Sequence, residues 1–266
     1  MRILQVLTVV TVLGTSIPCG LAQDAGSSKT PDRLTSQPDG ISAKGGLVIG
    51  TGGILYGTTS GGGNSNAGTV FSLKPPTAPG AGWTETVLYS FTGGSDGTGP
   101  AGLVIGTGKL YGTTSGGGNA NVGTVFSLTP PTAPGAGWTQ AVLYSFTGGS
   151  DGAAPAGVVI GAHDVLYGTT SGGGNANVGT IFSLKPPTAP GAGWTQAVLY
   201  SFTGGSDGAG PTGVEVGSGG VLRGTTSGGG TSNAGTVFSL TPPTAPGGSW
   251  TQAVLYSFTG GSDGGF

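Results

Sequence analysis

Charged residues are scarce in this sequence. They make up 7% of the 266 residues, whereas about a quarter is usual in globular domains. The net charge is −2, and the eight Lys and Arg residues form no cluster. Nucleic acids and anionic membrane surfaces both require clustered cations on their protein partners. We therefore expect no nucleic-acid partner and no binding to an anionic membrane.

Cysteine, histidine and glutamate are nearly absent as well. Cys19 and His163 each stand alone, and Glu85 and Glu215 are the only glutamates. A histidine-based metal site or catalytic triad repeated along the chain is therefore impossible, and a single cysteine forms no internal disulfide. No unique pair of acids stands out for glycoside hydrolysis, which needs two carboxyl groups flanking one bond. We expect no catalytic residues and no enzyme.

The longest apolar run is at the N-terminus. Arg2 precedes an apolar stretch from Ile3 to Leu13, and Gly20-Leu21-Ala22 offers small residues for cleavage, which is typical of a signal peptide. A membrane-spanning helix needs about 20 apolar residues, so this run is too short to be one. We predict a signal peptide over 1–22 and a mature chain without a transmembrane segment, secreted or held in the periplasm or at the cell surface. The alternatives are an N-terminal strand or helix, and a lipoprotein anchored at Cys19, which the preceding Pro18 disfavours.

What the sequence has in abundance is glycine, with 61 copies, arranged in a block that is repeated four times. Three kinds of landmark recur every 55 or 56 residues: Trp83, Trp138, Trp194 and Trp250; Tyr89, Tyr144, Tyr200 and Tyr256; and Asp96, Asp151, Asp207 and Asp263. Such a period indicates one supersecondary unit stacked on copies of itself. We predict a flexible polar lead-in over 23–45 and a β-repeat domain over 46–266, made of four units of about 56 residues.

The second block shows the strands that we expect in each unit. Its apolar runs are Leu103–Ile105, Leu110–Thr114, Thr124–Thr129 and Trp138–Thr147, separated by segments rich in Gly, Pro and Asn. Short β-branched or aromatic runs between turn formers predict β-strands. Strict alternation puts Phe126 and Leu128 on one face of the third strand. In the fourth strand it puts Trp138, Val142, Tyr144 and Phe146 on one face.

Four short strands per repeat predict an all-β fold of four tandem four-stranded repeats, arranged as a four-bladed β-propeller. The array begins with a lone first strand, Leu47–Ile49, and ends with the second, third and fourth strands of the last block. We expect Leu47–Ile49 to pair with that last block, which would close the ring and cover the sheet edges. The alternative is an open β-repeat arc or a solenoid.

Three linked motifs resemble the GloVer tandem repeats of secreted bacterial proteins. In the second block they are Leu110-Tyr111-Gly112-Thr113-Thr114, Gly123-Thr124-Val125-Phe126, and Leu143-Tyr144-Ser145-Phe146-Thr147-Gly148-Gly149-Ser150-Asp151-Gly152. The resemblance covers about 46 to 264 and implies an exported protein. It implies no catalytic residues that could be assigned to positions here. One local departure is Arg223, which stands where the other blocks have Tyr56, Tyr111 and Tyr167.

Polar loop residues are the strongest candidates for a binding site. In an antiparallel meander alternate loops emerge at the same end, so the loop over 115–122 shares an end with the loop over 148–155. The candidate ligand- or Ca²⁺-binding residues are Asp96, Asp151, Asp207, Asp263, Asn64, Asn119, Asn175, Asn121 and Asn177. Their oxygens suit Ca²⁺, but one carboxylate per block is sparse for a calcium site. The alternative is structural: the Asp caps its own turn and the Asn residues take left-handed conformations.

These observations leave two function classes. The first is an exported, non-enzymatic repeat scaffold or binding module for an unknown extracellular ligand, such as a glycan or a protein. The second is a polysaccharide-acting enzyme on a β-propeller that uses the loop aspartates. Near-identical blocks favour the first class, because an active site usually breaks repeat symmetry. The tryptophans fit either sugar stacking or packing between units, and their place at the start of a strand favours packing.

Overall fold

The computed structural model describes residues 39–264, except 190 and 246. The predicted signal peptide, 1–22, and the lead-in up to residue 38 lie outside the described residues. The described part is all-β, as predicted. Its helical segments are three short 3-10 turns: η1 (Thr51–Gly53), η2 (Ala162–Asp164) and η3 (Ser218–Gly220). Within this part of the chain, no helix has the length and apolar character needed to cross a membrane.

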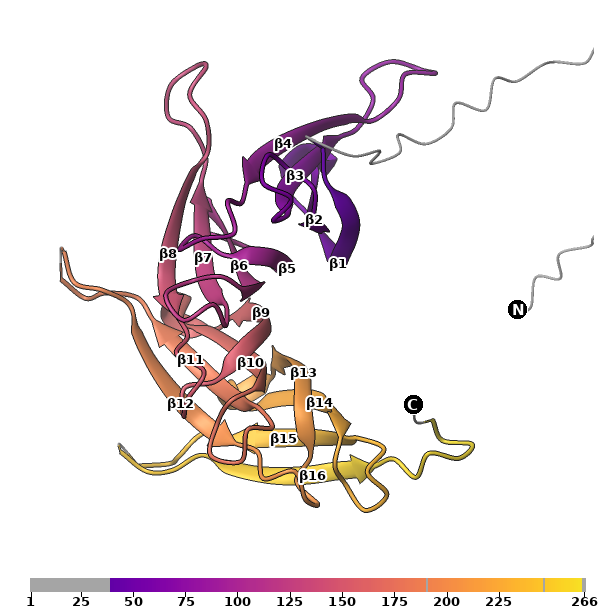
Figure 1. Cartoon of the computed structure of the whole chain (residues 1–266), viewed down its shortest axis with the longest axis vertical. Helices are drawn as coiled ribbons and strands as arrows, with labels where there is room; N and C mark the ends of the chain where they lie inside the picture. Colours follow the sequence, from indigo (N-terminus) through magenta and orange to yellow (C-terminus); the bar gives the residue numbers. More distant parts are fainter. Residues whose placement is uncertain (1–38, 190, 246, 265–266) are drawn as a thin grey trace, which may run out of the picture. The chain divides into compact units, whose positions relative to one another are not determined.

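Each repeat folds into one antiparallel sheet of four strands that follow one another in chain order (Figure 1). The predicted count of four strands per repeat is therefore confirmed. The sheets consist of β1 (Ile41–Ile49), β2 (Leu55–Gly61), β3 (Thr69–Lys74) and β4 (Thr84–Ser90); β5 (Thr98–Gly106), β6 (Lys109–Gly116), β7 (Thr124–Thr129) and β8 (Thr139–Ser145); β9 (Ala153–Ile160), β10 (Leu166–Gly172), β11 (Thr180–Lys185) and β12 (Thr195–Ser201); and β13 (Ala209–Val216), β14 (Leu222–Gly228), β15 (Thr236–Thr241) and β16 (Thr251–Ser257).

The third strand of each sheet follows the predicted alternation. In β7, Phe126 and Leu128 pair with residues of β6 in unbroken register, so their side chains share a face. Phe126 lies opposite Gly112, and its ring covers that glycine so closely that a Cβ atom at 112 would overlap it. The glycine in the middle of β6 is therefore required by the close approach of the ring.

The fourth strand departs from the predicted alternation. Val125 pairs with Tyr144, whereas Phe126 pairs with Val142, so Leu143 is an extra residue in β8. Such a β-bulge shifts the following side chains to the other face of the sheet. The prediction that Trp138, Val142, Tyr144 and Phe146 share a face is therefore wrong, because Tyr144 and Phe146 lie on the side opposite Trp138 and Val142. The same bulge occurs in β4, β12 and β16.

Adjacent sheets pack face to face, in the order of the chain. We call the side of a sheet that meets the preceding sheet its front face, and the side that meets the following sheet its back face. In the second sheet, the front face carries Leu110, Phe126 and Leu128, and the back face carries Val125 and Phe146. All five side chains are at most 3% exposed. Three such interfaces bury three apolar clusters, so the core lies between the sheets.

The first strand does not make the predicted ring closure. β1 pairs with β2, with Val48 opposite Tyr56, and it belongs to the first sheet. The predicted pairing of Leu47–Ile49 with the last repeat is wrong, and the propeller-like arrangement of the described sheets is open. The cause is local, because the short connection containing η1 returns the chain directly beside β1. β1 starts at Ile41, so the predicted lead-in over 23–45 overlaps it by residues 41–45.

Candidate functional site

The two polar loops of each repeat meet at one edge of its sheet, as predicted. In the second repeat, the backbone N–H of Phe146, which begins the loop after β8, donates to the carbonyl of Gly123, which ends the loop before β7, at 3.0 Å. The N–H of Asn119 donates to the hydroxyl of Ser145 at 2.8 Å. We call this edge, formed by 62–68 and 91–97 and their equivalents in the later repeats, the loop edge.

Each aspartate of the loop edge ties its turn to the preceding strand. Asp151 Oδ2 accepts a hydrogen bond from the Tyr144 hydroxyl (2.9 Å) and one from the Thr147 N–H (2.8 Å). Asp151 Oδ1 accepts the Thr147 hydroxyl at 2.6 Å. The same three bonds form at Asp96, Asp207 and Asp263. The carboxylate therefore closes the five-residue turn Thr147–Asp151 and its equivalent in every repeat, a role that fits the structural alternative.

These contacts shift the ionisation of both partners. Burial works to raise the pKa of Asp151, but the hydrogen bonds from Thr147 and Tyr144 outweigh it and hold the pKa below its usual value. At Asp263 the hydrogen bonds from the Thr259 side chain and backbone lower the pKa to about 2. Burial, and then the contact with Asp151, raises the pKa of Tyr144 to about 12. At neutral pH the carboxylate is charged and the phenol keeps the proton that it donates.

The candidate asparagines fall into two structural classes. Asn121 has a left-handed backbone, with φ of 58°, and its Oδ1 accepts the N–H of Gly117 at 3.0 Å. Asn66, Asn177 and Asn233 do the same in the other repeats. The residues of the second class, Asn64, Asn119 and Asn175, use their backbone N–H to bind a serine of the fourth strand, and they are exposed. All of these asparagines are exposed, but the first class uses its side-chain oxygen inside the loop, whereas within the described residues the side-chain amides of the second class make no hydrogen bond.

The loop edge is continuous from one repeat to the next. The N–H of Gly118 donates to the carbonyl of Gly94 in the preceding repeat at 2.9 Å. Gly174 bonds in the same way to Gly149, and Gly230 to Gly205, both at 2.9 Å. Asn119 and Asn175 are thus held in the same relation to the repeat before each of them, as is Thr231 of the fourth repeat, and the edge presents a regular row of similar polar loops.

Calcium binding at this edge stays a prediction. Each aspartate already accepts three hydrogen bonds, so a cation would have to share or displace these donors. Within 39–264, apart from 190 and 246, no three His, Cys, Asp or Glu side chains come together in a group that could hold a metal ion. A calorimetric titration with Ca²⁺ and a melting curve in its presence test the prediction.

The comparison with known families gives one match that covers most of the chain. The model of the Gloeobacter/Verrucomicrobia repeat matches residues 44–266. The chain belongs to the Gloeobacter/Verrucomicrobia repeat family. The GloVer resemblance seen in the sequence is thereby confirmed. No curated protein matches the sequence.

The motifs that mark the Gloeobacter/Verrucomicrobia repeat have structural roles in this fold. The Leu-Tyr-Gly-Thr-Thr motif is the second strand, and its Tyr111 stacks edge-on against Trp194 of the next sheet, with ring centroids 6.0 Å apart. The Tyr-Ser-Phe-Thr-Gly-Gly-Ser-Asp-Gly motif contains the Tyr144–Asp151 hydrogen bond. Sequence reasoning missed this bond, although the seven-residue spacing of Tyr and Asp in all four repeats is its signal.

The tryptophans of the later three repeats pack between sheets, as the strand position favoured. Trp138 and Trp250 lie on front faces and contact tyrosines of the preceding sheets, both with ring centroids 6.3 Å apart, in the same way as Trp194. Trp83 lies on the front face of the first sheet and is 43% exposed. The equivalent tryptophan is therefore packed between sheets in the later three repeats and exposed in the first.

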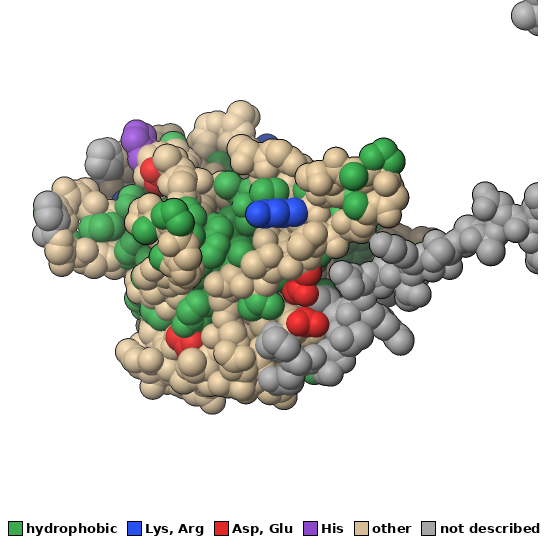
Figure 2. All heavy atoms as spheres, turned by 90° about the horizontal axis from the view of Figure 1, so that it is seen from above, with side chains coloured by type: hydrophobic (Ala, Val, Ile, Leu, Met, Phe, Trp, Pro, Cys, Tyr) green, Lys and Arg blue, Asp and Glu red, His purple; other side chains and the backbone are tan. Residues whose placement is uncertain are grey.

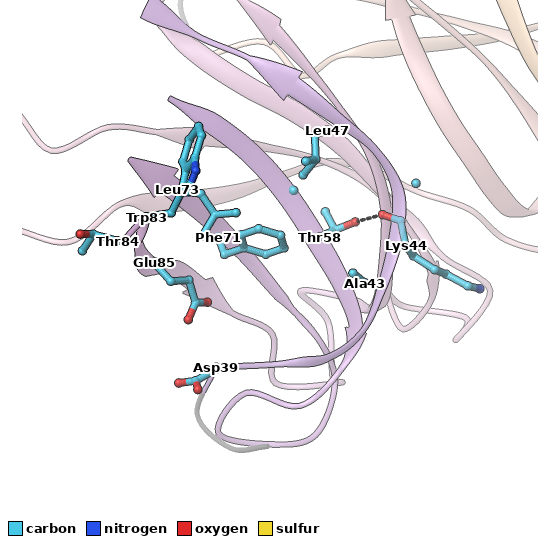
Figure 3. Close-up of a pocket in the computed structure, with 12 residues that line it drawn as sticks. Asp39, Ala43, Lys44, Leu47, Thr58, Phe71, Leu73, Trp83, Thr84 and Glu85 are labelled. Carbon is cyan, nitrogen blue, oxygen red and sulfur yellow. Dashed lines mark hydrogen bonds between the residues drawn. The ribbon is translucent and has the colours of Figure 1, made fainter. Parts of the chain in front are cut away.

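Trp83 borders a groove of about 630 Å³ on the front face of the first sheet. Figure 3 shows Leu47, Phe71 and Leu73 beside it, with Asp39 and Glu85 along one side. In Figure 2, which views the molecule from above, hydrophobic side chains reach the surface among a few charged ones and a larger area of other side chains and backbone. Sequence reasoning did not single out this groove. Its signal is Glu85, which replaces the glutamine of the other repeats.

Proposed function

We propose that this protein is an exported, non-enzymatic repeat scaffold that binds an extracellular ligand through its loop edge. The observation that carries the proposal is the regular row of exposed amides at Asn64, Asn119 and Asn175, each on a loop fixed by the same backbone bonds. Equal sites in a row favour a repetitive partner such as a glycan or a fibrous protein, because several weak contacts then act together. The signal-like residues 1–22 support export.

Repeat symmetry favours binding over catalysis. The loop aspartates make the same three structural hydrogen bonds in every repeat. A general acid instead needs a raised pKa, whereas the pKa values of Asp151 and Asp207 lie below the usual value. We therefore assign the aspartates to the architecture of the loop edge and the exposed asparagines to recognition.

The test is capture on glycan and extracellular-matrix protein arrays, followed by substitution of the loop edge. We expect Asn119→Ala with Asn175→Ala to weaken capture at least about tenfold, since two of the repeated amides are lost. The matched control is Thr132→Ala with Thr188→Ala, which changes exposed residues on the loops at the opposite end of the strands.

Equal loss in both double variants would contradict binding at the loop edge. Turnover of a glycan by the full chain would support the enzyme class instead, provided that Asp151→Asn with Asp207→Asn abolishes it and leaves the fold unchanged by circular dichroism.

A further inference from the structure

We propose that the front face of the first sheet is a docking site for the back face of the fourth sheet of a second copy of this chain. The front face of the first sheet and the back face of the fourth are both open and lie at opposite ends of the stack of described sheets. The proposal is independent of the proposed ligand of the loop edge, because the faces and the loops use different residues.

Three internal interfaces provide the template for this contact. In the first of them, Trp138 on a front face stacks edge-on against Tyr56 on a back face. Phe126 on the same front face meets Phe91, with ring centroids 5.1 Å apart. The amide of Gln140 donates to the carbonyl of Asp96 at 3.3 Å. The second and third interfaces repeat all three contacts.

The front face of the first sheet carries the same apolar residues without a preceding sheet. Leu47 is 52% exposed, whereas its equivalent Leu103 is 8% exposed. Leu73 is half-buried, whereas its equivalent Leu128 is fully buried. Trp83, with 43% of its surface exposed, completes the set. This front face therefore carries the residues that meet a back face in each internal interface.

The back face of the fourth sheet is open in the complementary way. Leu255 and Tyr256 are 55% and 47% exposed, although the equivalent residues of the other sheets are half-buried in interfaces. Phe258 is half-buried, whereas its equivalent Phe146 is fully buried. Both halves of one further interface are therefore present in a single chain, and a second copy supplies the missing match to each.

Departures from the repeat pattern place charges on both open faces: Arg223 and Glu215 on the back face of the fourth sheet, and Glu85 on the front face of the first. Arg223 takes the place of the tyrosine that meets tryptophan, and it lies over Gly217 as Tyr111 lies over Gly106. Docking would bring Arg223 against the ring of Trp83, where a guanidinium is attracted by the aromatic face. Glu85, two residues further along the front face, adds a negative charge near this cation. Glu215, which lies opposite Arg223 in the register of the fourth sheet, is on the same face as this cation.

A contact between two different faces is heterologous. Such head-to-tail contacts form closed rings where the rotation permits and open filaments where it does not. In either form the association is concentration-dependent and uses one front face and one back face per contact. A second copy therefore covers the apolar surface that the missing ring closure leaves exposed.

Sedimentation velocity of the full chain over a series of concentrations tests the proposal. We expect reversible self-association that Trp83→Ala weakens at least about tenfold, since buried aromatic anchors dominate interfaces. Arg223→Glu should weaken it to a similar degree, and Arg223→Tyr should preserve it by restoring the internal pattern. The charge-reversing control Lys109→Glu, on an exposed residue of the second sheet, should leave association unchanged.

Mixing the two defective variants gives the decisive readout. Trp83→Ala retains an intact back face and Arg223→Glu retains an intact front face, so the mixture should form pairs of one chain each and nothing larger. A chain that is monomeric at all concentrations, or association that survives Trp83→Ala and Arg223→Glu, would overturn the proposal. Larger assemblies in the mixture would also overturn it. Circular dichroism of each variant confirms that the fold is intact.

Discussion

At the scale of single residues, each loop carboxylate is a structural group whose ionisation is linked to folding. Asp151 is held by two partners, Tyr144 and Thr147, through three hydrogen bonds. Its pKa lies below the usual value because these donors stabilise the charged form. Protonation in acid would remove acceptor capacity and weaken the turn. Asp207 and Asp263 act in the same direction.

We predict that this linkage makes the fold sensitive to acid. A depressed pKa in the folded state means that the unfolded chain binds more protons, so the free energy of unfolding falls as the pH falls below the ordinary aspartate value of 3.8 toward about 2. The double variant Asp151→Asn with Asp207→Asn should be less stable at pH 7 and should show a smaller fall in acid. Urea unfolding at pH 7 and at several acidic pH values measures both effects.

The control for the acid prediction is Asp164→Asn, which changes an exposed aspartate of η2 that adopts a left-handed conformation tolerated by asparagine. This variant should keep the pH dependence of the unsubstituted chain. An equal loss of stability in acid for the unsubstituted chain and the double variant would contradict the linkage.

At the scale of the element, buried threonines bind the second strand of each sheet to the third. The hydroxyls of Thr170 and Thr180 lie 2.9 Å apart, and the N–H of Thr180 donates to the Thr170 hydroxyl at 3.0 Å. Thr170 also donates to the carbonyl of Gly172 at 2.9 Å. Its neighbour Thr169 is equally buried, but its hydroxyl has no hydrogen-bond partner among the described residues.

We predict that these two neighbours respond oppositely to the same substitution. Thr170→Val leaves the Thr180 N–H without its partner and leaves the Thr180 hydroxyl only the carbonyl of Asp151 at 3.5 Å, so it should lower the free energy of unfolding by about 1–3 kcal/mol. Thr169→Val replaces an unbonded hydroxyl by a methyl group and should be neutral or stabilising. Chemical unfolding of the two single variants makes the comparison. A larger loss for Thr169→Val than for Thr170→Val would contradict this account of the strand pair.

The strands themselves were largely predictable, and the bulges were not. The run Thr124–Thr129 coincides with β7, because its β-branched and aromatic residues are bounded by glycine and proline. The bulge at Leu143 could not be predicted from the alternation of apolar and polar residues, since Val142, Leu143 and Tyr144 are all apolar and are compatible with any register. The candidate residues lie at the predicted edge, because alternate loops of an antiparallel meander emerge at the same end. Which asparagines use their side-chain oxygen inside the loop depended on hydrogen bonds that the sequence does not show.

At the scale of the whole molecule, the described sheets form a series in which every internal interface uses the same side chains. Closure could not be predicted, because the repeats are so alike that β1 fits beside either its own sheet or the last one in pattern alone. The short connection through η1 decides for its own sheet. Stability in such a series is close to a sum of repeat and nearest-neighbour terms. Equivalent substitutions in different interfaces should therefore have equal effects.

Replacing each tryptophan in turn by alanine tests this claim most directly, with the free energy of unfolding measured at a concentration low enough to keep the chain monomeric. Trp138→Ala, Trp194→Ala and Trp250→Ala each remove an anchor between two sheets and should cost similar amounts, about 2–4 kcal/mol, because large side chains leave cavities. Trp83→Ala changes an exposed side chain on an open face and should cost less than about 1 kcal/mol. Equal losses at all four positions, or no loss at the three internal ones, would contradict an open series of equivalent β-sheets.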